Sequence, residues 1–169
     1  FWESRFKSQA LLDERALLTC MAYVDLNPIR ACMAKSLGDS EYTSIKERIE
    51  AESTDLLPFG KGDNDLPYYL SSYIDLVDET GRIIRDGAYM DIGVSREQDA
   101  EATKKGYISQ KLGSALTKLE LNPDTWLDEL KGFKSFGYSA AGTVSQLREY
   151  SQKTKRKWSV GIRLQPALE

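Results

Sequence analysis

A tyrosine and an asparagine four residues apart, Tyr23 and Asn27, are the side chains in this sequence whose types and spacing could do chemistry together. They lie in the segment MAYVDLNPIR, residues 21–30, within a run of apolar residues at helical spacing. Positions four apart on a helix are neighbours, with Cβ atoms about 5–6 Å apart. A tyrosine hydroxyl is a weak nucleophile, because its ordinary pKa is about 10. It becomes useful when a metal ion polarises the phosphate that it attacks, and the product is a phosphotyrosine link.

Asn27 and Arg30 are candidates for the other parts of such a site. A neutral carbonyl oxygen one turn after the tyrosine is a suitable ligand for Mg²⁺ or Mn²⁺. Arg30 could bind a DNA phosphate through two charge-assisted hydrogen bonds. The structural alternative needs no chemistry: Tyr23 packs its ring in the core, and Asn27 followed by Pro28 is a favoured pair at the start of a helix. The spacing alone leaves both interpretations open.

The elements that must position these residues are predicted to be a short strand and two helices. Residues 5–13 alternate weakly in polarity and are predicted to form a strand that runs into a turn. Asp13 is predicted to cap a helix over residues 14–27, which Pro28 ends because the residue before a proline avoids the helical region. A second short helix is predicted over residues 28–37.

The rest of the chain is predicted to be mostly helical, with loops rich in Gly, Pro and Asp. A helix over 39–52 has Asp39 or Ser40 as its expected cap, and a helix from 68 is expected to end near Gly81. The segment GKGDND at 60–65 is interpreted as a turn, since it lacks the endings of phosphate and calcium loops. Further predictions are an irregular segment at 86–106 and helices over 109–121, 122–133 and 141–162, the last fading into a basic tail.

The composition excludes several kinds of protein. An apolar fraction of 41% and a net charge of −3 are typical of a folded domain rather than a disordered or membrane chain. No apolar run approaches the roughly 20 residues of a spanning helix. With no histidine, the chain cannot build Ser-His or Cys-His nucleophile pairs or zinc sites that need imidazole. Cys20 and Cys32 are expected to be small buried thiols in a reducing cytoplasm.

Basic residues gather beside an aromatic one near the C-terminus. Residues 139–169 carry six Lys or Arg against two Asp or Glu, whereas residues 36–138 carry twelve against twenty. Cations next to an aromatic ring suit single-stranded DNA, because they pair with phosphates while the ring stacks on a base. The alternative is a solvated helix end with the aromatic ring folded onto the core. The candidate DNA-binding residues in this tail are Lys153, Lys155, Arg156, Lys157 and Trp158.

Residues 1–35 resemble the last part of the catalytic domain of single-tyrosine HUH transposases, in particular the REP-associated tyrosine transposases. The pattern is a tryptophan, a strand with phenylalanine, an Asp-Glu pair and the motif Tyr-hydrophobic-x-x-Asn-Pro-hydrophobic-Arg-Ala. Shorter stretches such as YTSIKERI and LNPDTWL look like the helical extension of one bacterial subgroup. The matching residues are Trp2, Phe6, Asp13, Glu14, Tyr23, Val24, Asn27, Pro28, Ile29, Arg30 and Ala31.

The resemblance implies a fold and a reaction. Residues 1–35 would be the C-terminal end of an α+β ferredoxin-like catalytic domain with an antiparallel sheet, and residues 36–169 a helical extension with a basic tail, so that this chain is mostly α. The intact mobile-element protein would cleave and rejoin single-stranded, hairpin-flanked DNA through a 5′-phosphotyrosine intermediate. Tyr23 would be the nucleophile, and Asn27 would complete a site for Mg²⁺ or Mn²⁺.

One part of the family pattern is absent. A His-hydrophobic-His motif, N-terminal to the region that begins here, supplies the other metal ligands in that family. We therefore expect this chain to be a C-terminal portion of a longer protein, or a piece of a decayed element, and to be inactive alone. The alternatives are a non-catalytic DNA-binding or regulatory remnant and a helical protein-interaction module. The expected partner is single-stranded or hairpin DNA and no membrane, in the cytoplasm, and a homodimer is left open.

Overall fold

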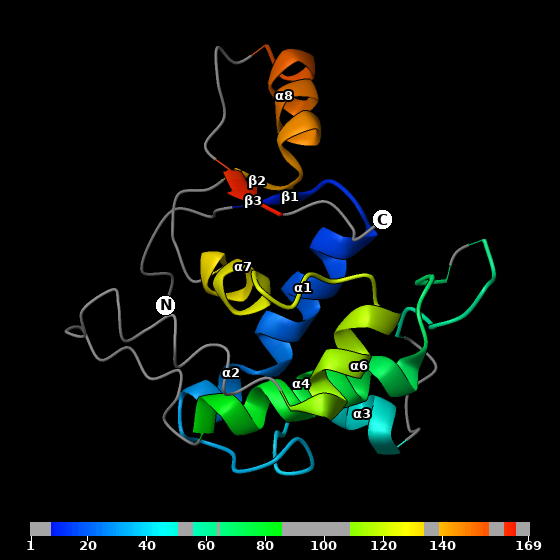
Figure 1. Cartoon of the computed structure of the whole chain (residues 1–169), viewed down its shortest axis with the longest axis vertical. Coiled ribbons are helices and arrows are strands. Elements are labelled where there is room, and N and C mark those ends of the chain that lie inside the picture. The colour runs from blue at the N-terminus through cyan, green and yellow to red at the C-terminus, as the bar shows by residue number, and fades with distance from the viewer. Residues whose placement is uncertain are drawn as a thin grey trace.

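Helices make up most of the part of the chain that the computed structural model describes, namely residues 8–50, 56–63, 65–85, 109–133, 139–155 and 161–164 (Figure 1). This confirms the prediction of a mostly α chain for the described part. Trp2 and Phe6, which carry part of the resemblance, and the segment 86–106 lie outside the described residues. The helices are α1 (Glu14–Asp25), α2 (Asn27–Arg30), α3 (Ser44–Glu50), α4 (Leu70–Arg85), α6 (Gln110–Lys118), α7 (Trp126–Gly132) and α8 (Val144–Lys153).

A small parallel sheet joins the two ends of the described chain. Its strands are β1 (Ala10–Leu11), β2 (Ala140–Gly142) and β3 (Gly161–Arg163), in the order β1-β2-β3. The helix predicted over 141–162 is therefore wrong at both ends, which are strands. The described strands pair in parallel, whereas a ferredoxin-like domain has an antiparallel sheet. The described residues therefore do not confirm the ferredoxin-like assignment, which stays a prediction.

The first helix begins and ends where its sequence predicts. Asp13 has an extended backbone, and its carboxylate accepts a 2.7 Å hydrogen bond from the Ala16 amide. This side chain satisfies one of the amides that a helix start leaves without a partner. Helix α1 then buries Leu18 and Ala22 against the core, and it ends at Asp25.

The second helix is shorter than predicted, because its backbone turns out of the helix at Cys32. That residue has a left-handed φ of 56°. The Met33 amide donates to the Pro28 carbonyl at 2.8 Å, and the Cys32 amide donates to the Ile29 carbonyl at 3.0 Å. These two bonds form a Schellman motif, a helix ending in which glycine normally takes the left-handed position. The helix predicted over 28–37 thus ends at Arg30.

The third helix takes its cap from a distant part of the chain. Asp39 and Ser40, its expected caps, lie in turns that precede it. Helix α3 begins at Ser44, whose hydroxyl donates to Asp25 Oδ1 at 2.9 Å, and the Ile45 amide donates to the same oxygen at 3.2 Å. A carboxylate from α1 therefore replaces the local cap that the sequence favours.

The sequence predicts that the helix from residue 68 ends near Gly81. Helix α4 (Leu70–Arg85) instead continues through Gly81 to Arg85. Gly81 serves packing instead. A methyl group at this position would lie 2.9 Å from Ile29 Cδ1 and 3.4 Å from Leu26 Cδ2. The missing side chain lets α4 approach the junction between α1 and α2 closely.

The later predictions are confirmed in part. The side chain of Ser109 caps α6 through a 3.0 Å bond from the Leu112 amide, and the segment 60–65 is a turn within its described residues. Helix α7 starts at Trp126 rather than beside Asn122, whose side chain instead accepts from Asp124 N–H at 2.9 Å in a preceding turn.

One main core holds the helices together. It is built from apolar side chains of α1, α2, α4, α6 and α7, and a smaller cluster lies against the sheet. Residues on both sides of the boundary predicted at residue 35 contribute to the main core, and the division into two domains stays a prediction. In the part of the chain described here, no helix is both long enough and apolar enough to cross a membrane. The largest fully buried side chains include Leu18, Leu26, Tyr73, Leu116 and Trp126.

Candidate functional site

The junction between α1 and α2 keeps helical spacing although it divides two helices. The Leu26 amide donates to the Ala22 carbonyl at 3.0 Å, and the Arg30 amide donates to the Leu26 carbonyl at 2.9 Å. Leu26 itself has helical dihedral angles. Positions three and four apart therefore remain neighbours across the junction, which places Tyr23 and Asn27 on the same side as Arg30.

Tyr23 is half-buried, and its ring contacts side chains from two other parts of the chain. The Arg30 guanidinium carbon lies 4.4 Å from the centre of the Tyr23 ring. This is a cation–π contact, in which the cation is attracted by the negative face of the ring. The Phe133 ring, at the end of α7, lies 6.1 Å from the Tyr23 ring at an interplanar angle of 36°. Both contacts are made to the phenol ring of Tyr23.

Asn27 is exposed, and its side-chain oxygen is engaged by Arg30. Arg30 Nη1 donates to Asn27 Oδ1 at 3.2 Å. Arg30 is therefore the residue that contacts both of the others. The structure thus brings together Tyr23, Asn27 and Arg30, the three candidates from the N-terminal segment, into one arrangement, which we call the tyrosine cluster.

The described neighbours of Asn27 do not fit a divalent metal ion by themselves. Mg²⁺ and Mn²⁺ prefer several oxygen ligands, commonly including carboxylates. Asn27 offers one neutral oxygen, already bonded to a cation, and the described residues hold no group of three or more His, Cys, Asp or Glu that could bind a metal. Further ligands would have to come from outside this part of the protein.

Helix α8, which carries the tail residue Lys153, lies away from the α1–α2 junction of the tyrosine cluster. Helix α8 forms one end of the molecule beyond the sheet, and α2 lies toward the other end (Figure 1). Lys153 makes a 2.7 Å ion pair with Glu149, whose carboxyl pKa is lowered by the hydrogen bond and charge of that lysine. Lys155 is exposed, with a left-handed φ of 54°. The remaining tail candidates, Arg156, Lys157 and Trp158, lie outside the described residues.

A buried polar network centred on Asp25 of α1 was not predicted from the sequence. Asp25 is fully buried and accepts a 2.6 Å hydrogen bond from the Tyr73 hydroxyl through Oδ2. Burial, and then the Asp25 charge, raise the pKa of Tyr73 well above its ordinary value. The sequence feature that could have indicated this network is one acidic residue, Asp25, within the apolar stretch AYVDL.

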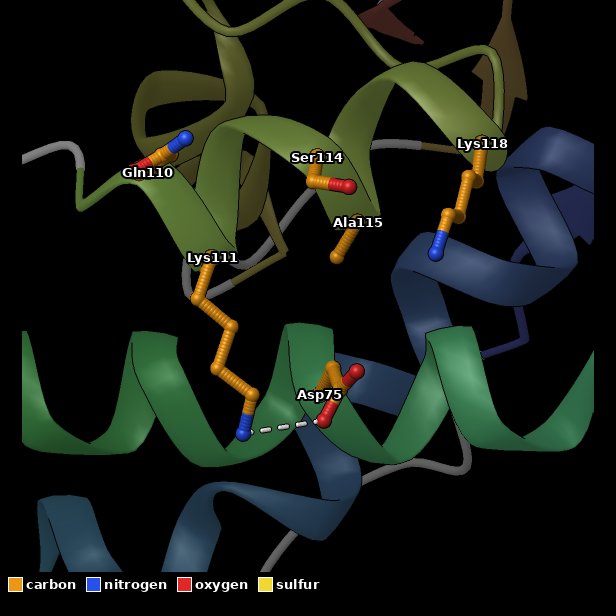
Figure 2. A pocket seen from close by; sticks show the side chains of 6 residues that line it. All are labelled: Asp75, Gln110, Lys111, Ser114, Ala115 and Lys118. Carbon is orange, nitrogen blue, oxygen red and sulfur yellow. Dashed lines mark ion pairs between the residues drawn. The ribbon is translucent and has the colours of Figure 1, made fainter.

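A shallow hollow of about 460 Å³ lies between α4 and α6 (Figure 2). Lys111 crosses it to pair with Asp75 at 3.0 Å, and the hydrogen bond and charge of that carboxylate raise the Lys111 pKa. Lys118 also extends from α6 toward α4. The hollow is open, and the ion pair between Lys111 and Asp75 neutralises a lysine that could otherwise bind an anion.

No family model matches this chain, and neither the curated proteins nor the solved structures contain a significant match to it.

Proposed function

We propose that this chain is part of a DNA transposase of the single-tyrosine HUH type, with Tyr23 as the nucleophile. The observation that carries the proposal is the tyrosine cluster, in which a phenol lies beside a guanidinium at the surface of the molecule. The resemblance of residues 1–35 to this family supports it as well, since that resemblance includes residues outside the cluster such as Asp13, Glu14 and Pro28.

The proposed reaction is a transesterification at one DNA phosphate. The Tyr23 oxygen forms a bond to phosphorus, and the bond from phosphorus to the 3′ oxygen of the preceding nucleotide breaks. The leaving 3′ oxygen receives a proton, the phenol gives one up, and the phosphate remains joined to the tyrosine as a 5′-phosphotyrosine. Because the bond energies on both sides are similar, a 3′ hydroxyl can reverse the step and rejoin DNA.

Arg30 is suited to hold the phosphate that Tyr23 attacks. A guanidinium has five N–H donors in a planar fork, and the fork matches two oxygens of a phosphate. Asn27 accepts from one nitrogen of this fork, Nη1, which leaves other donors for a ligand. The positive charge would also stabilise negative charge that develops on the phosphate oxygens during attack.

We propose that the intact protein, but not this chain alone, binds a divalent ion, Mg²⁺ or Mn²⁺, at the site. Such an ion acts as a Lewis acid on a phosphate oxygen. Its other ligands must be supplied by residues beyond those described here, as the histidine pair does in the family that residues 1–35 resemble. We therefore propose that this chain alone forms no covalent adduct with DNA.

The tail is proposed as a second contact to the same DNA. Exposed Lys155, with Arg156, Lys157 and Trp158 beyond it, would bind the phosphates and stack on a base of single-stranded DNA near the hairpin. Because α8 and α2 lie toward opposite ends of the molecule in Figure 1, a DNA strand that reaches both Lys153 and the tyrosine cluster would extend along the molecule. Lys153 contributes less, because Glu149 already neutralises it.

The experiment that tests the proposed function is adduct formation by the intact protein that contains this chain. A hairpin oligonucleotide labelled at its 3′ end is incubated with the protein and Mn²⁺, and a band that resists detergent is sought. Tyr23→Phe should abolish the adduct, while Tyr69→Phe, at a tyrosine that directly precedes α4 and is 65% exposed, should leave it unchanged. An adduct that persists in Tyr23→Phe would contradict the proposal.

The alternative is a non-catalytic DNA-binding or regulatory remnant, favoured by the lack of histidine in this chain. It predicts that the intact protein binds the hairpin but gives no adduct at any metal concentration. A helical protein-interaction module predicts neither binding nor adduct.

A further inference from the structure

We infer that Asn27 is a positioning residue that holds the Arg30 guanidinium over the Tyr23 ring, and that it does not act as a metal ligand in this chain. The inference deepens the proposed function, and it rests on that function for the identity of the ligand, a phosphodiester of single-stranded DNA. It differs from the role that the family resemblance implies for Asn27.

The first ground is the partner that Asn27 has. Its Oδ1 atom accepts a hydrogen bond from Arg30 Nη1 at 3.2 Å, within the usual range for such bonds. A divalent ion on the second lone pair of Oδ1 would lie beside the cationic guanidinium. Like charges at such short distance repel, so the guanidinium disfavours a metal ion at this oxygen.

The second ground is what Arg30 does while Asn27 holds it. Its guanidinium carbon lies 4.4 Å from the centre of the Tyr23 ring, so that its plane and charge are next to the phenol. An arginine side chain has many rotamers in solution, and a partner at its end reduces their number. Asn27 therefore selects the arginine conformation that lies against Tyr23.

The third ground is the backbone that fixes the two residues. Asn27 and Arg30 are the first and last residues of α2, three positions apart, where side chains meet on a helix. The Schellman bonds at Cys32 and Met33 hold the end of this short helix. The spacing of the two side chains is thus set before any ligand arrives.

The first test needs no DNA. Ring currents of Tyr23 should shift the NMR signals of the Arg30 Cδ protons upfield, and Tyr23→Leu should remove this shift. Asn27→Ala should reduce the shift, and Asn27→Asp, which keeps an acceptor, should retain it. Gln110→Ala, at an exposed amide on α6, is the matched control and should change nothing. An Arg30 shift that is unaltered by Asn27→Ala would overturn the inference, whatever the protein does with DNA.

The second test measures binding of a short single-stranded oligonucleotide by fluorescence anisotropy, in EDTA and in Mn²⁺. Losing one hydrogen bond to the guanidinium should weaken binding by about three- to tenfold in Asn27→Ala. This effect should vanish in an Arg30→Met background and be the same in both buffers. If the effect of Asn27→Ala persists in Arg30→Met, Asn27 acts without Arg30 and the positioning role is refuted. If the effect requires Mn²⁺, Asn27 acts as a metal ligand and the positioning role is refuted as well. If the wild-type chain binds no oligonucleotide while the NMR result holds, the proposed function fails and the positioning role stands.

Discussion

The carboxylate of Asp25 accepts a 2.6 Å hydrogen bond from the hydroxyl of Tyr73, although the two residues lie on different helices and both are fully buried. The other oxygen of Asp25 caps α3 through Ser44 and Ile45. One side chain therefore joins α1, α3 and α4. A buried carboxylate is tolerated only when hydrogen bonds replace its lost hydration, and three donors do so here.

The first prediction is that Asp25→Ala destabilises the fold strongly. The substitution leaves two buried donors, the Tyr73 hydroxyl and the Ile45 amide, and the half-buried Ser44 hydroxyl without their acceptor. Each buried loss costs about 1–3 kcal/mol, so a decrease of at least about 2 kcal/mol in the free energy of unfolding is expected. Urea denaturation followed by circular dichroism measures it. Asp78→Ala, which breaks the exposed 2.9 Å pair with Arg82, is the control and should cost under about 1 kcal/mol. Equal effects of the two substitutions would contradict the central role of Asp25.

The second prediction concerns alkaline pH. The folded-state pKa of Tyr73 is raised well above its ordinary value, chiefly by burial, and burial also raises the pKa of Tyr68 to about 12. Above a pH of about 10 the unfolded chain releases these protons while the folded chain keeps them, so stability falls as pH rises. The contribution of each neutral phenol is complete below about pH 10 and is lost toward its folded-state pKa.

The measurement is the free energy of unfolding in urea between about pH 8 and pH 11.5, a window that brackets the ordinary tyrosine pKa. The slope should be negative above pH 10, and Tyr73→Phe should make it shallower while lowering stability at pH 8. A slope that Tyr73→Phe leaves unchanged would show that this phenol does not set the alkaline limit.

The third prediction concerns the contact between α4 and α2. Alanine normally stabilises a helix interior relative to glycine by about 1 kcal/mol. At Gly81 the sign should reverse, because the new methyl group would lie 2.9 Å from Ile29 Cδ1. We expect Gly81→Ala to cost about 1–3 kcal/mol, as overpacking does. Thermal unfolding measures the change, and Ile29→Val, which removes Cδ1, should rescue part of it in the double variant. No rescue would mean that the contact is relieved elsewhere.

The fourth prediction concerns the largest side chain in the core. Trp126 Nε1 donates to Thr80 Oγ1 at 3.1 Å, with both residues buried. Thr80→Val keeps the shape but removes the acceptor, and it should cost about 1–3 kcal/mol. Thr80→Ser keeps an acceptor and should cost less. Urea unfolding followed by tryptophan fluorescence measures both, and an equal cost would point to packing rather than to the hydrogen bond.

Local signals predicted the helix that carries Tyr23. These signals are Asp13 at the cap, apolar residues at helical spacing and Pro28 after the helix end. Each of them acts on the backbone within a few residues of its own position. The contacts of Arg30 with Tyr23 and Asn27 were not predicted, whereas the placement of those two residues on one side followed from their spacing in the sequence. Interactions of this range can be derived from a sequence because the backbone geometry alone decides which side chains are neighbours.

The features that escaped prediction depend on distant partners. Strands of two or three residues, such as the Ala140–Gly142 segment of β2, have no alternation to reveal them, and they exist because another strand pairs with them. The cap of α3 comes from Asp25, and the ring beside Tyr23 comes from Phe133. In each case tertiary contacts decided what the local sequence left open.

The pairing of β1 with β2 also sets an order in which the molecule can assemble during synthesis. Ala10 leaves the ribosome 130 residues before its sheet partner, Ala140. Contacts between such distant positions form slowly, because a long loop must close before they stabilise anything. The nascent chain can complete α1 and α2, which carry Tyr23 and Arg30, well before it can close the sheet. A ribosome stalled before Ala140 should thus hold a chain that a protease still cleaves near Leu11, and protection from the protease should appear there only once β2 has left the ribosome.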